Sequence, residues 1–153
     1  TPVARLLDES DLADLQVKTS DLSSGWIATP QASKESFTIS VGLKDTKWKY
    51  SGRTVELSLK VHDTEIAATK EFDSKQLVAT GQADGKGKQI LEYQSYFIWD
   101  SFPNNHAERW SGFGKYRNIT IGLSHYATPG WTDKNIAREM METQLEKLAS
   151  ITD

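Results

Sequence analysis

The strict alternation of apolar and polar residues in two segments is the feature that most constrains the fold. Residues 37–43 and residues 55–61 each place an apolar side chain at every second position. Because successive side chains of a β-strand point to opposite faces, each segment is predicted to be a strand with one apolar and one wet face. Ser51 and Gly52, between them, are turn residues that favour antiparallel pairing.

Helical patterns occur in three other places. Residues 65–79 contain no Pro or Gly and follow Asp63 and Thr64, which offer N-cap side chains. Residues 136–151 carry apolar side chains at steps of three and four, behind a cap at Thr132 or Asp133, so an amphipathic C-terminal helix is expected. Residues 4–15 suit one or two short helical turns.

Further strands are predicted from less regular patterns. Residues 26–29 suit a short edge strand that Pro30 ends. Residues 89–102 are expected to form one strand, apolar on both faces in its second half and therefore central in the sheet. The aromatic segment 110–116 leads into another alternating strand at 119–123.

This order of elements predicts an α+β fold, with a mainly antiparallel sheet and helices packed on it. A length of 153 residues is typical of one domain, so residues 1–153 are expected to form a single α+β domain. Five Trp, five Tyr and five Phe provide large apolar areas for its core.

Composition excludes several functional classes. The balance of 18 Lys and Arg against 21 Asp and Glu, without a basic block, predicts no nucleic-acid partner. No window approaches the roughly 20 apolar residues that a membrane-spanning helix needs. The absence of Cys excludes disulfides, thiol nucleophiles and Cys-ligated metals. The start at Thr1, with no apolar signal core, suits a mature form or one from which a leader or tag was removed.

Several short motifs resemble those of one group of proteins. They are residues 54–68 followed by Phe72, then Arg117-Asn118-Ile119, then Ala137 with Gln144-Leu145-Glu146-Lys147-Leu148, and an opening Leu6-Leu7 with Gly25-Trp26. In this order they resemble small extracytoplasmic lipoproteins and sensor-like domains of bacteria and archaea. The resemblance implies a binding or sensing domain at the cell surface or in the periplasm, with no known catalytic residues. It also implies that any membrane attachment is through an N-terminal lipid anchor outside this chain.

Motifs for catalysis and for metal binding are weak. His62, His106 and His125 lack the spacing of a metal site, and no His-Glu-x-x-His motif occurs, so no cofactor or metal is predicted. Residues 81–88 contain three Gly and two Lys but fail the spacing of a phosphate-binding loop. Asn118-Ile119-Thr120 matches the glycosylation triplet, yet it falls at a predicted strand, and a chance match is expected.

Aromatic residues are concentrated in the C-terminal half. Ten of the 15 lie between Tyr93 and Trp131. Aromatic faces stack on sugar rings and anchor partners at low entropic cost. The candidate ligand-binding residues are Trp99, Trp110, Tyr116 and Trp131. The predicted function is therefore a non-enzymatic extracytoplasmic domain that binds a small ligand, a glycan or a protein.

Two alternatives belong to other classes. One is a small hydrolase that uses His62 or His106 with a carboxylate such as Asp100 or Glu108. The other is a structural or assembly subunit whose apolar surface is covered by copies of itself. A hydrolase requires a deep pocket with perturbed pKa values, a binding domain an open aromatic groove, and an assembly subunit a flat apolar patch.

Overall fold

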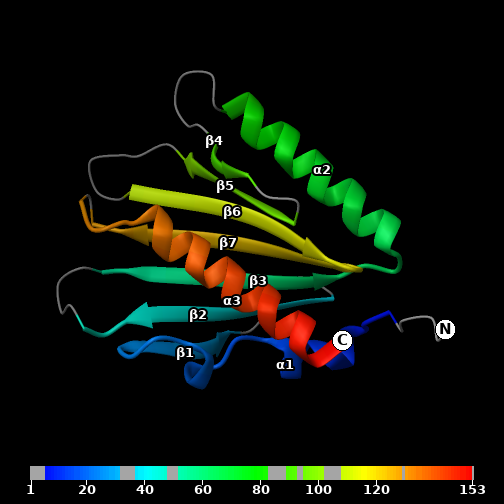
Figure 1. Cartoon of the computed structure of the whole chain (residues 1–153), viewed down its shortest axis with the longest axis horizontal. Coiled ribbons are helices and arrows are strands. Elements are labelled where there is room, and N and C mark those ends of the chain that lie inside the picture. The colour runs from blue at the N-terminus through cyan, green and yellow to red at the C-terminus, as the bar shows by residue number, and fades with distance from the viewer. Residues whose placement is uncertain are drawn as a thin grey trace.

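The computed structural model describes residues 6–31, 37–47, 52–82, 89–92, 95–101, 108–128 and 130–152. They form one seven-stranded antiparallel sheet with helices on both faces, in the spatial order β1-β2-β3-β7-β6-β5-β4 (Figure 1). The strands are β1 (Trp26–Gln31), β2 (Thr38–Asp45), β3 (Thr54–Val61), β4 (Gln89–Glu92), β5 (Tyr96–Ser101), β6 (Glu108–Tyr116) and β7 (Ile119–Ala127). The predicted α+β class and antiparallel sheet are confirmed.

The chain builds the sheet as two meanders that meet at its middle. The first runs through β1, β2 and β3, and the predicted pairing of the two alternating segments is present, with Val41 opposite Leu57. Helix α2 (Glu65–Gln82) then carries the chain to the far edge, from which β4 to β7 return to lie beside β3. Helix α3 (Lys134–Thr152) follows β7 and crosses the sheet (Figure 1).

The predicted caps were partly right. The α2 helix is capped by the Thr64 hydroxyl, which accepts the N–H of Ala67 at 3.1 Å, and not by Asp63. The α3 helix is capped by Asp133, whose carboxylate accepts the N–H of Asn135 at 2.8 Å. Both helices therefore begin where a side-chain oxygen satisfies a free backbone N–H.

One face of the sheet is sealed by α3 and by the N-terminal segment, which contains η1 (Glu9–Asp11), α1 (Leu12–Leu15) and η2 (Thr19–Asp21). The inward residues of the alternating strands meet these elements in the main core. Its largest fully buried aliphatic members are Leu12, Leu15, Leu43, Leu57, Leu59, Ile98, Ile119, Ile121, Met141 and Leu148. The apolar half of the alternation is thereby removed from water, which is the main driving force for this packing.

The opposite face is covered only in part. Helix α2 packs on β5, β6 and β7 through a smaller cluster of Phe72, Ala79 and Phe97, flanked by Trp99 and Phe113. Over β2 and β3 the same face carries the polar half of the alternation, including Ser40, Lys44, Glu56 and Ser58. In the part of the chain that the structure describes, no helix covers these two strands on this side.

Two glycines in β6 allow α3 to approach the sheet closely. A Cβ atom at Gly114 would lie 2.9 Å from the sulfur of Met141, and one at Gly112 would lie 3.5 Å from the terminal methyl of the same residue. Met141 is completely buried. The Met141 side chain therefore occupies the space that a side chain at Gly114 would need, whereas a Cβ at Gly112 would be crowded mainly by Ile98 (3.2 Å) and the Phe97 carbonyl (3.3 Å) of β5.

Two buried side-chain amides attach the N-terminal segment to the β6–β7 turn and to α3. Asn118, at the β6–β7 turn, donates to the carbonyl oxygens of Leu7 (2.7 Å) and His62 (2.9 Å) and accepts the N–H of Leu7 (3.1 Å). Gln144 on α3 accepts the N–H of Val17 (3.2 Å) and donates to the carbonyl of Leu15 (2.7 Å). Because the Asn118 amide is buried and fully engaged, its match to the glycosylation triplet has no accessible acceptor.

The region predicted as one central strand is two strands near an edge. β4 and β5 form a hairpin, and β5 lies second from the edge of the sheet. Its two apolar faces have a different cause, because Phe97 packs on α2 while Ile98 packs in the main core on the opposite side. Helices on both faces, and not a central position, explain the pattern.

Two other details differ from the prediction. Residues 110–116 belong to the strand β6, whose alternation is hidden in the sequence because Gly112 and Gly114 occupy inward positions. Pro30 lies inside β1 instead of ending it. β1 is an edge strand, as predicted, and an edge position is where a residue without an N–H is tolerated.

The outer edge of β1 offers no free donor for another strand. The N–H of Trp26 donates to the Ser23 carbonyl (3.2 Å) and that of Ala28 donates to the Thr19 hydroxyl (3.0 Å), while Pro30 has none. At these three alternate positions the backbone N–H direction points away from β2. An assembly subunit would therefore need another surface, such as Ile66 and Leu77 on α2, which are 70% and 75% exposed.

We expect Gly114→Ala to lower the free energy of unfolding by about 1–3 kcal/mol, because the added methyl overlaps Met141. Gly122→Ala is the matched control in the neighbouring strand, since its Cβ would meet nothing closer than the Ser58 Cβ at 3.9 Å, and it should change stability by less than about 0.5 kcal/mol. Urea unfolding of both variants measures the difference. Equal losses in the two variants would contradict the proposed close approach of α3.

Candidate functional site

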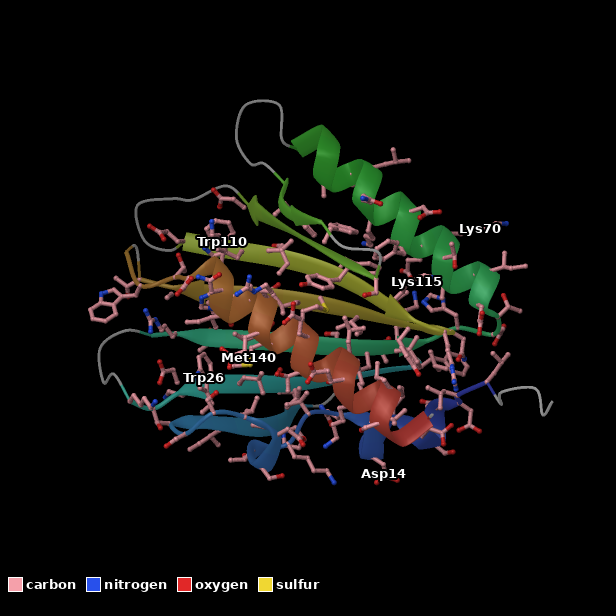
Figure 2. All side chains as sticks on the ribbon, in the orientation of Figure 1. Asp14, Trp26, Lys70, Trp110, Lys115 and Met140 are labelled. Atoms are coloured by element: carbon pink, nitrogen blue, oxygen red, sulfur yellow. The ribbon has the colours of Figure 1, made fainter. Side chains whose placement is uncertain are left out.

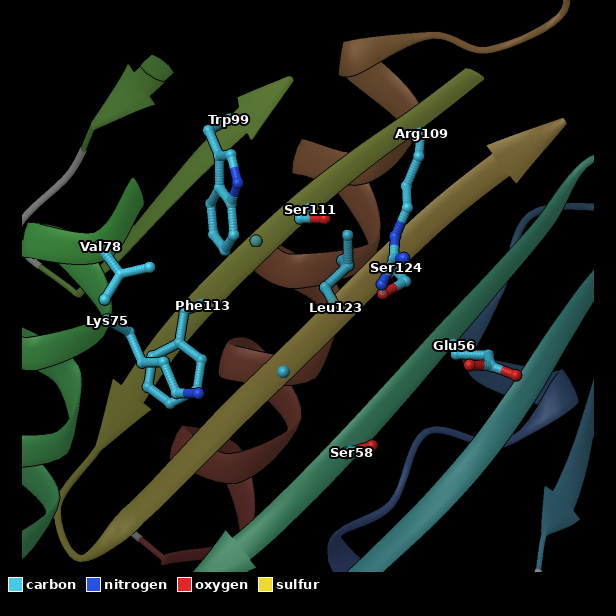
Figure 3. Close-up of a pocket in the computed structure, with 12 residues that line it drawn as sticks. Glu56, Ser58, Lys75, Val78, Trp99, Arg109, Ser111, Phe113, Leu123 and Ser124 are labelled. Carbon is cyan, nitrogen blue, oxygen red and sulfur yellow. Dashed lines mark hydrogen bonds between the residues drawn. The ribbon is translucent and has the colours of Figure 1, made fainter. Parts of the chain in front are cut away.

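A pocket of about 390 Å³ opens on the half-covered face, where α2 lies beside the sheet (Figure 3). Its volume falls at the lower end of the range usual for small-molecule sites. The residues that line it are Glu56, Ser58, Lys75, Val78, Trp99, Arg109, Ser111, Gly112, Phe113, Gly122, Leu123 and Ser124. They come from α2 and from four adjacent strands, β3, β5, β6 and β7.

The strand register sets the layout of the pocket. One row of directly paired positions runs across the sheet from Trp99 through Ser111 and Ser124 to Glu56. The next row runs from Phe113 through Gly122 to Ser58. Each row begins with an aromatic residue beside α2 and continues over serine or glycine on β6 and β7. These small residues leave a hollow next to the aromatic side chains.

Trp99 and Phe113 form an aromatic wall that packs against a buried phenylalanine ring. The Trp99 and Phe113 rings lie 5.4 Å and 6.3 Å from the buried ring of Phe97, which in turn meets Phe72 of α2 edge-on at 5.3 Å. Aromatic pairs at these separations add to the stabilisation from burial. The wall is therefore held in place before any ligand arrives.

Charged side chains stand around the wall and the floor. The Lys75 ammonium lies 5.9 Å from the centroid of the Phe113 ring, and Arg109 donates to the Ser124 hydroxyl at 3.1 Å. On the far side, Glu56 accepts from the Tyr126 hydroxyl at 3.5 Å. Among the described residues, two cations and one carboxylate thus line the pocket.

The four predicted ligand-binding residues do not share one surface. Trp99 lines the pocket. Trp110, which is labelled in Figure 2, and Tyr116 alternate with the outward residues of β6, and both pack against the main core on the opposite face of the sheet. Trp131 lies in the loop before α3 and is 38% exposed, with the Arg53 guanidinium 5.6 Å from its ring.

The remaining pocket residues were missed because sequence reasoning weighted aromatic density. A usable signal was present in the polar half of the alternation, which places Glu56 and Ser58 on the wet face of β3. β6 gave no such signal for Arg109, Ser111 and Phe113, because glycines at its inward positions remove the apolar alternation. Contact between these strands depends on pairing across about 65 residues of chain, from Ser58 to Gly122.

His62 has a carboxylate partner, but it is neither of those expected. Its Nε2 lies 2.7 Å from a Glu71 oxygen of α2 and 2.8 Å from the hydroxyl of the buried Thr120. Burial lowers the pKa of His62 and nearby Lys60 adds to this effect, whereas Glu71 opposes it. A hydroxyl nucleophile is activated by a base whose other nitrogen is oriented by a third group, and here both partners contact the same nitrogen.

The His62 cluster therefore resembles a polar cross-link between β3, β7 and α2. Lys60 extends it, with its ammonium 3.3 Å from the second oxygen of Glu71. His106, the other histidine of the hydrolase hypothesis, lies outside the described residues, as do residues 83–88 of the glycine-rich segment.

His125 is fully buried in a structural role. Its Nδ1 donates to the carbonyl of Thr54 (3.0 Å), and its Nε2 accepts the N–H of Asp133, the capping residue of α3 (3.1 Å). These contacts require the neutral ring with its proton on Nδ1. Burial lowers the pKa of His125; Arg53 acts in the same direction, while the Thr54 carbonyl and Asp133 oppose it.

Among the described residues, no three or more His, Asp and Glu side chains are grouped so that they could hold a metal ion. Within the same residues, no helix has the length and apolar character needed to cross a membrane.

Comparisons of the chain with family models, with curated proteins and with solved structures found no match.

We expect the free energy of unfolding to fall as the pH is lowered from about 7.5 to about 5. Burial holds the pKa of His125 in the folded chain below the ordinary value of 6.5. The contribution of His125 to stability is therefore complete above that pH and is lost as the pH falls below it. Urea unfolding at both pH values should show that His125→Gln is less stable at neutral pH but loses less stability in acid.

His62→Gln is the control, because His62 also has a lowered pKa but is less buried. Between the two pH values, the free energy of unfolding of this variant should fall nearly as much as that of the wild type. An acid loss in His125→Gln as large as that of the wild type would refute the assignment of His125 as the neutral, proton-excluding group.

Proposed function

We propose that this chain is a non-enzymatic binding domain that takes a ligand in the pocket between α2 and the open face of the sheet. The observation that carries the proposal is the pairing of a supported aromatic wall with a floor of hydroxyl and charged side chains in one hollow. Binding sites commonly combine an apolar surface with a few fixed polar groups that orient the ligand.

The absence of a histidine among the described residues that line the pocket supports a binding role over the predicted hydrolase, which would use a histidine. Three serines line the pocket, Ser58, Ser111 and Ser124, but none of the lining residues in the described part of the chain is a histidine. A serine nucleophile requires a base within hydrogen-bond reach. Arg109, the partner of Ser124, is a permanent cation and cannot accept the proton.

The same proposal includes an extracytoplasmic location, at the cell surface or in the periplasm. It is supported by the motif resemblance described above. Fractionation of the source cells, with an antibody against this chain, tests it. Recovery of the protein in the cytosolic fraction alone would contradict the location and leave the pocket argument standing.

We expect Trp99 to be required for binding and Trp131 to be dispensable. A panel of neutral sugars, acidic sugars, aromatic carboxylates and short acidic peptides is added to the isotope-labelled protein, and amide and indole N–H shifts are recorded. At least one probe should shift the Trp99 indole and the Gly122 amide. For that probe, Trp99→Ala should weaken binding about tenfold or more, which corresponds to about 1.4 kcal/mol.

Trp131→Ala is the matched control, since it removes an exposed tryptophan that does not line the pocket. It should bind the probe with unchanged affinity. If no probe shifts the pocket signals, or if Trp131→Ala loses binding and Trp99→Ala keeps it, the pocket is not the binding site.

A further inference from the structure

We infer that the pocket binds an acidic saccharide, that is, an oligosaccharide whose rings carry carboxylate groups. This inference rests on the proposed binding function and names its ligand class. Three properties of the pocket point to it, namely its aromatic wall, its hydroxyl-lined floor and its charge balance.

The wall suits the apolar face of a sugar ring. Trp99 presents a flat indole that packs against Phe97, its neighbour on the same face of β5, at 5.4 Å between ring centroids and 31° between ring planes. Phe113 is less available as a platform, because the Lys75 ammonium stands over its ring. Trp99 is therefore the stacking surface, and its fixed position lowers the entropic cost of binding.

The floor suits a ligand that has hydroxyl groups of its own. Ser58, Ser111 and Ser124 carry groups that both donate and accept hydrogen bonds, and Glu56 accepts only. An apolar ligand would remove water from these polar groups without replacing the hydrogen bonds of that water, which costs free energy. Sugar hydroxyls, which donate and accept, satisfy both kinds of partner.

The charge balance of the pocket is opposite to that of the chain. The chain carries a net charge of -3. Among the described residues that line the pocket, Lys75 and Arg109 outnumber Glu56. Arg109 is held by its bond to the Ser124 hydroxyl, and an arginine fork matches the two oxygens of a carboxylate. The local excess of cations therefore favours an anionic ligand.

The shape of the open face favours a chain of rings over a single ring. The row from Trp99 to Glu56 crosses three strand spacings, or about 14 Å. The floor then continues to β2, where the Ser40 hydroxyl lies 3.1 Å from that of Ser58 and where Lys44 is exposed. A longer acidic saccharide can follow this row, so a trimer should bind more tightly than a monomer.

The test compares ligands that differ only in charge. Trimers of galacturonate, glucuronate and mannuronate, each with its methyl-ester form, are titrated into the full chain while the Trp99 indole and Gly122 amide signals are followed. At least one acid trimer should bind, and its methyl ester should bind at least tenfold more weakly. Aromatic carboxylates and an acidic peptide are titrated in the same way.

Variants assign the charge recognition to one residue. Arg109→Gln should weaken binding of the acid trimer about tenfold and should leave the binding of its ester nearly unchanged. Arg109→Lys should recover part of the loss, because the charge remains without the fork. Lys134→Gln, at the exposed start of α3 and outside the pocket, removes the same charge and should have no effect.

The outcomes separate the two proposals. If the esters bind as tightly as the acids, or if only aromatic carboxylates or the peptide shift the pocket signals, the saccharide inference is overturned while the binding function stands. If no ligand shifts the Trp99 signal, the binding function itself fails. Acid-selective binding that depends on Arg109 and not on Lys134 supports both.

Discussion

The close contact between α3 and β6 is the packing on which the rest of the structure depends. Met141 packs against Gly112 and Gly114. A Cβ at Gly114 would overlap the Met141 sulfur, and one at Gly112 would crowd Ile98 and the Phe97 carbonyl of β5. With the helix this close, the inward residues of β3 and β7 are excluded from water on one face. The opposite face is then free to keep polar and small residues, and the pocket lies there.

Two buried side-chain amides hold the N-terminal segment against the same face of the sheet as α3. Asn118 and Gln144 pair with the backbone at Leu7, Leu15 and Val17, so the N-terminal segment is fixed by hydrogen bonds to side chains and not by joining the sheet. Each amide would lose several partners at once if it were replaced, and a buried group left unpaired costs about 1–3 kcal/mol. The geometry of this segment is therefore specified by two residues far from it in sequence.

Local patterns made much of the fold predictable, and long-range packing accounts for what they missed. β2, β3 and α3 were predicted because each carries its own period, of two or of about 3.6 residues, whereas α2 was predicted from its N-cap residues and a run without Pro or Gly. β6 was not recognised as a strand, because its inward glycines remove the apolar signal, and β5 was misplaced because helices cover both of its faces. Of the candidate site, only Trp99 was identified, since aromatic content does not tell which face a side chain occupies.

The junction between β3 and β7 joins the two meanders, and it also forms the floor of the pocket. Val55 lies opposite His125, and Ser58 lies opposite Gly122, so each pair joins positions more than 60 residues apart along the chain. Contacts of such long sequence range form slowly, because the loop must close before they are gained. The pocket thus exists only once both meanders have docked. A ligand held across this junction would bind the native chain alone and would slow the separation of its two halves, which makes ligand binding a source of kinetic stability.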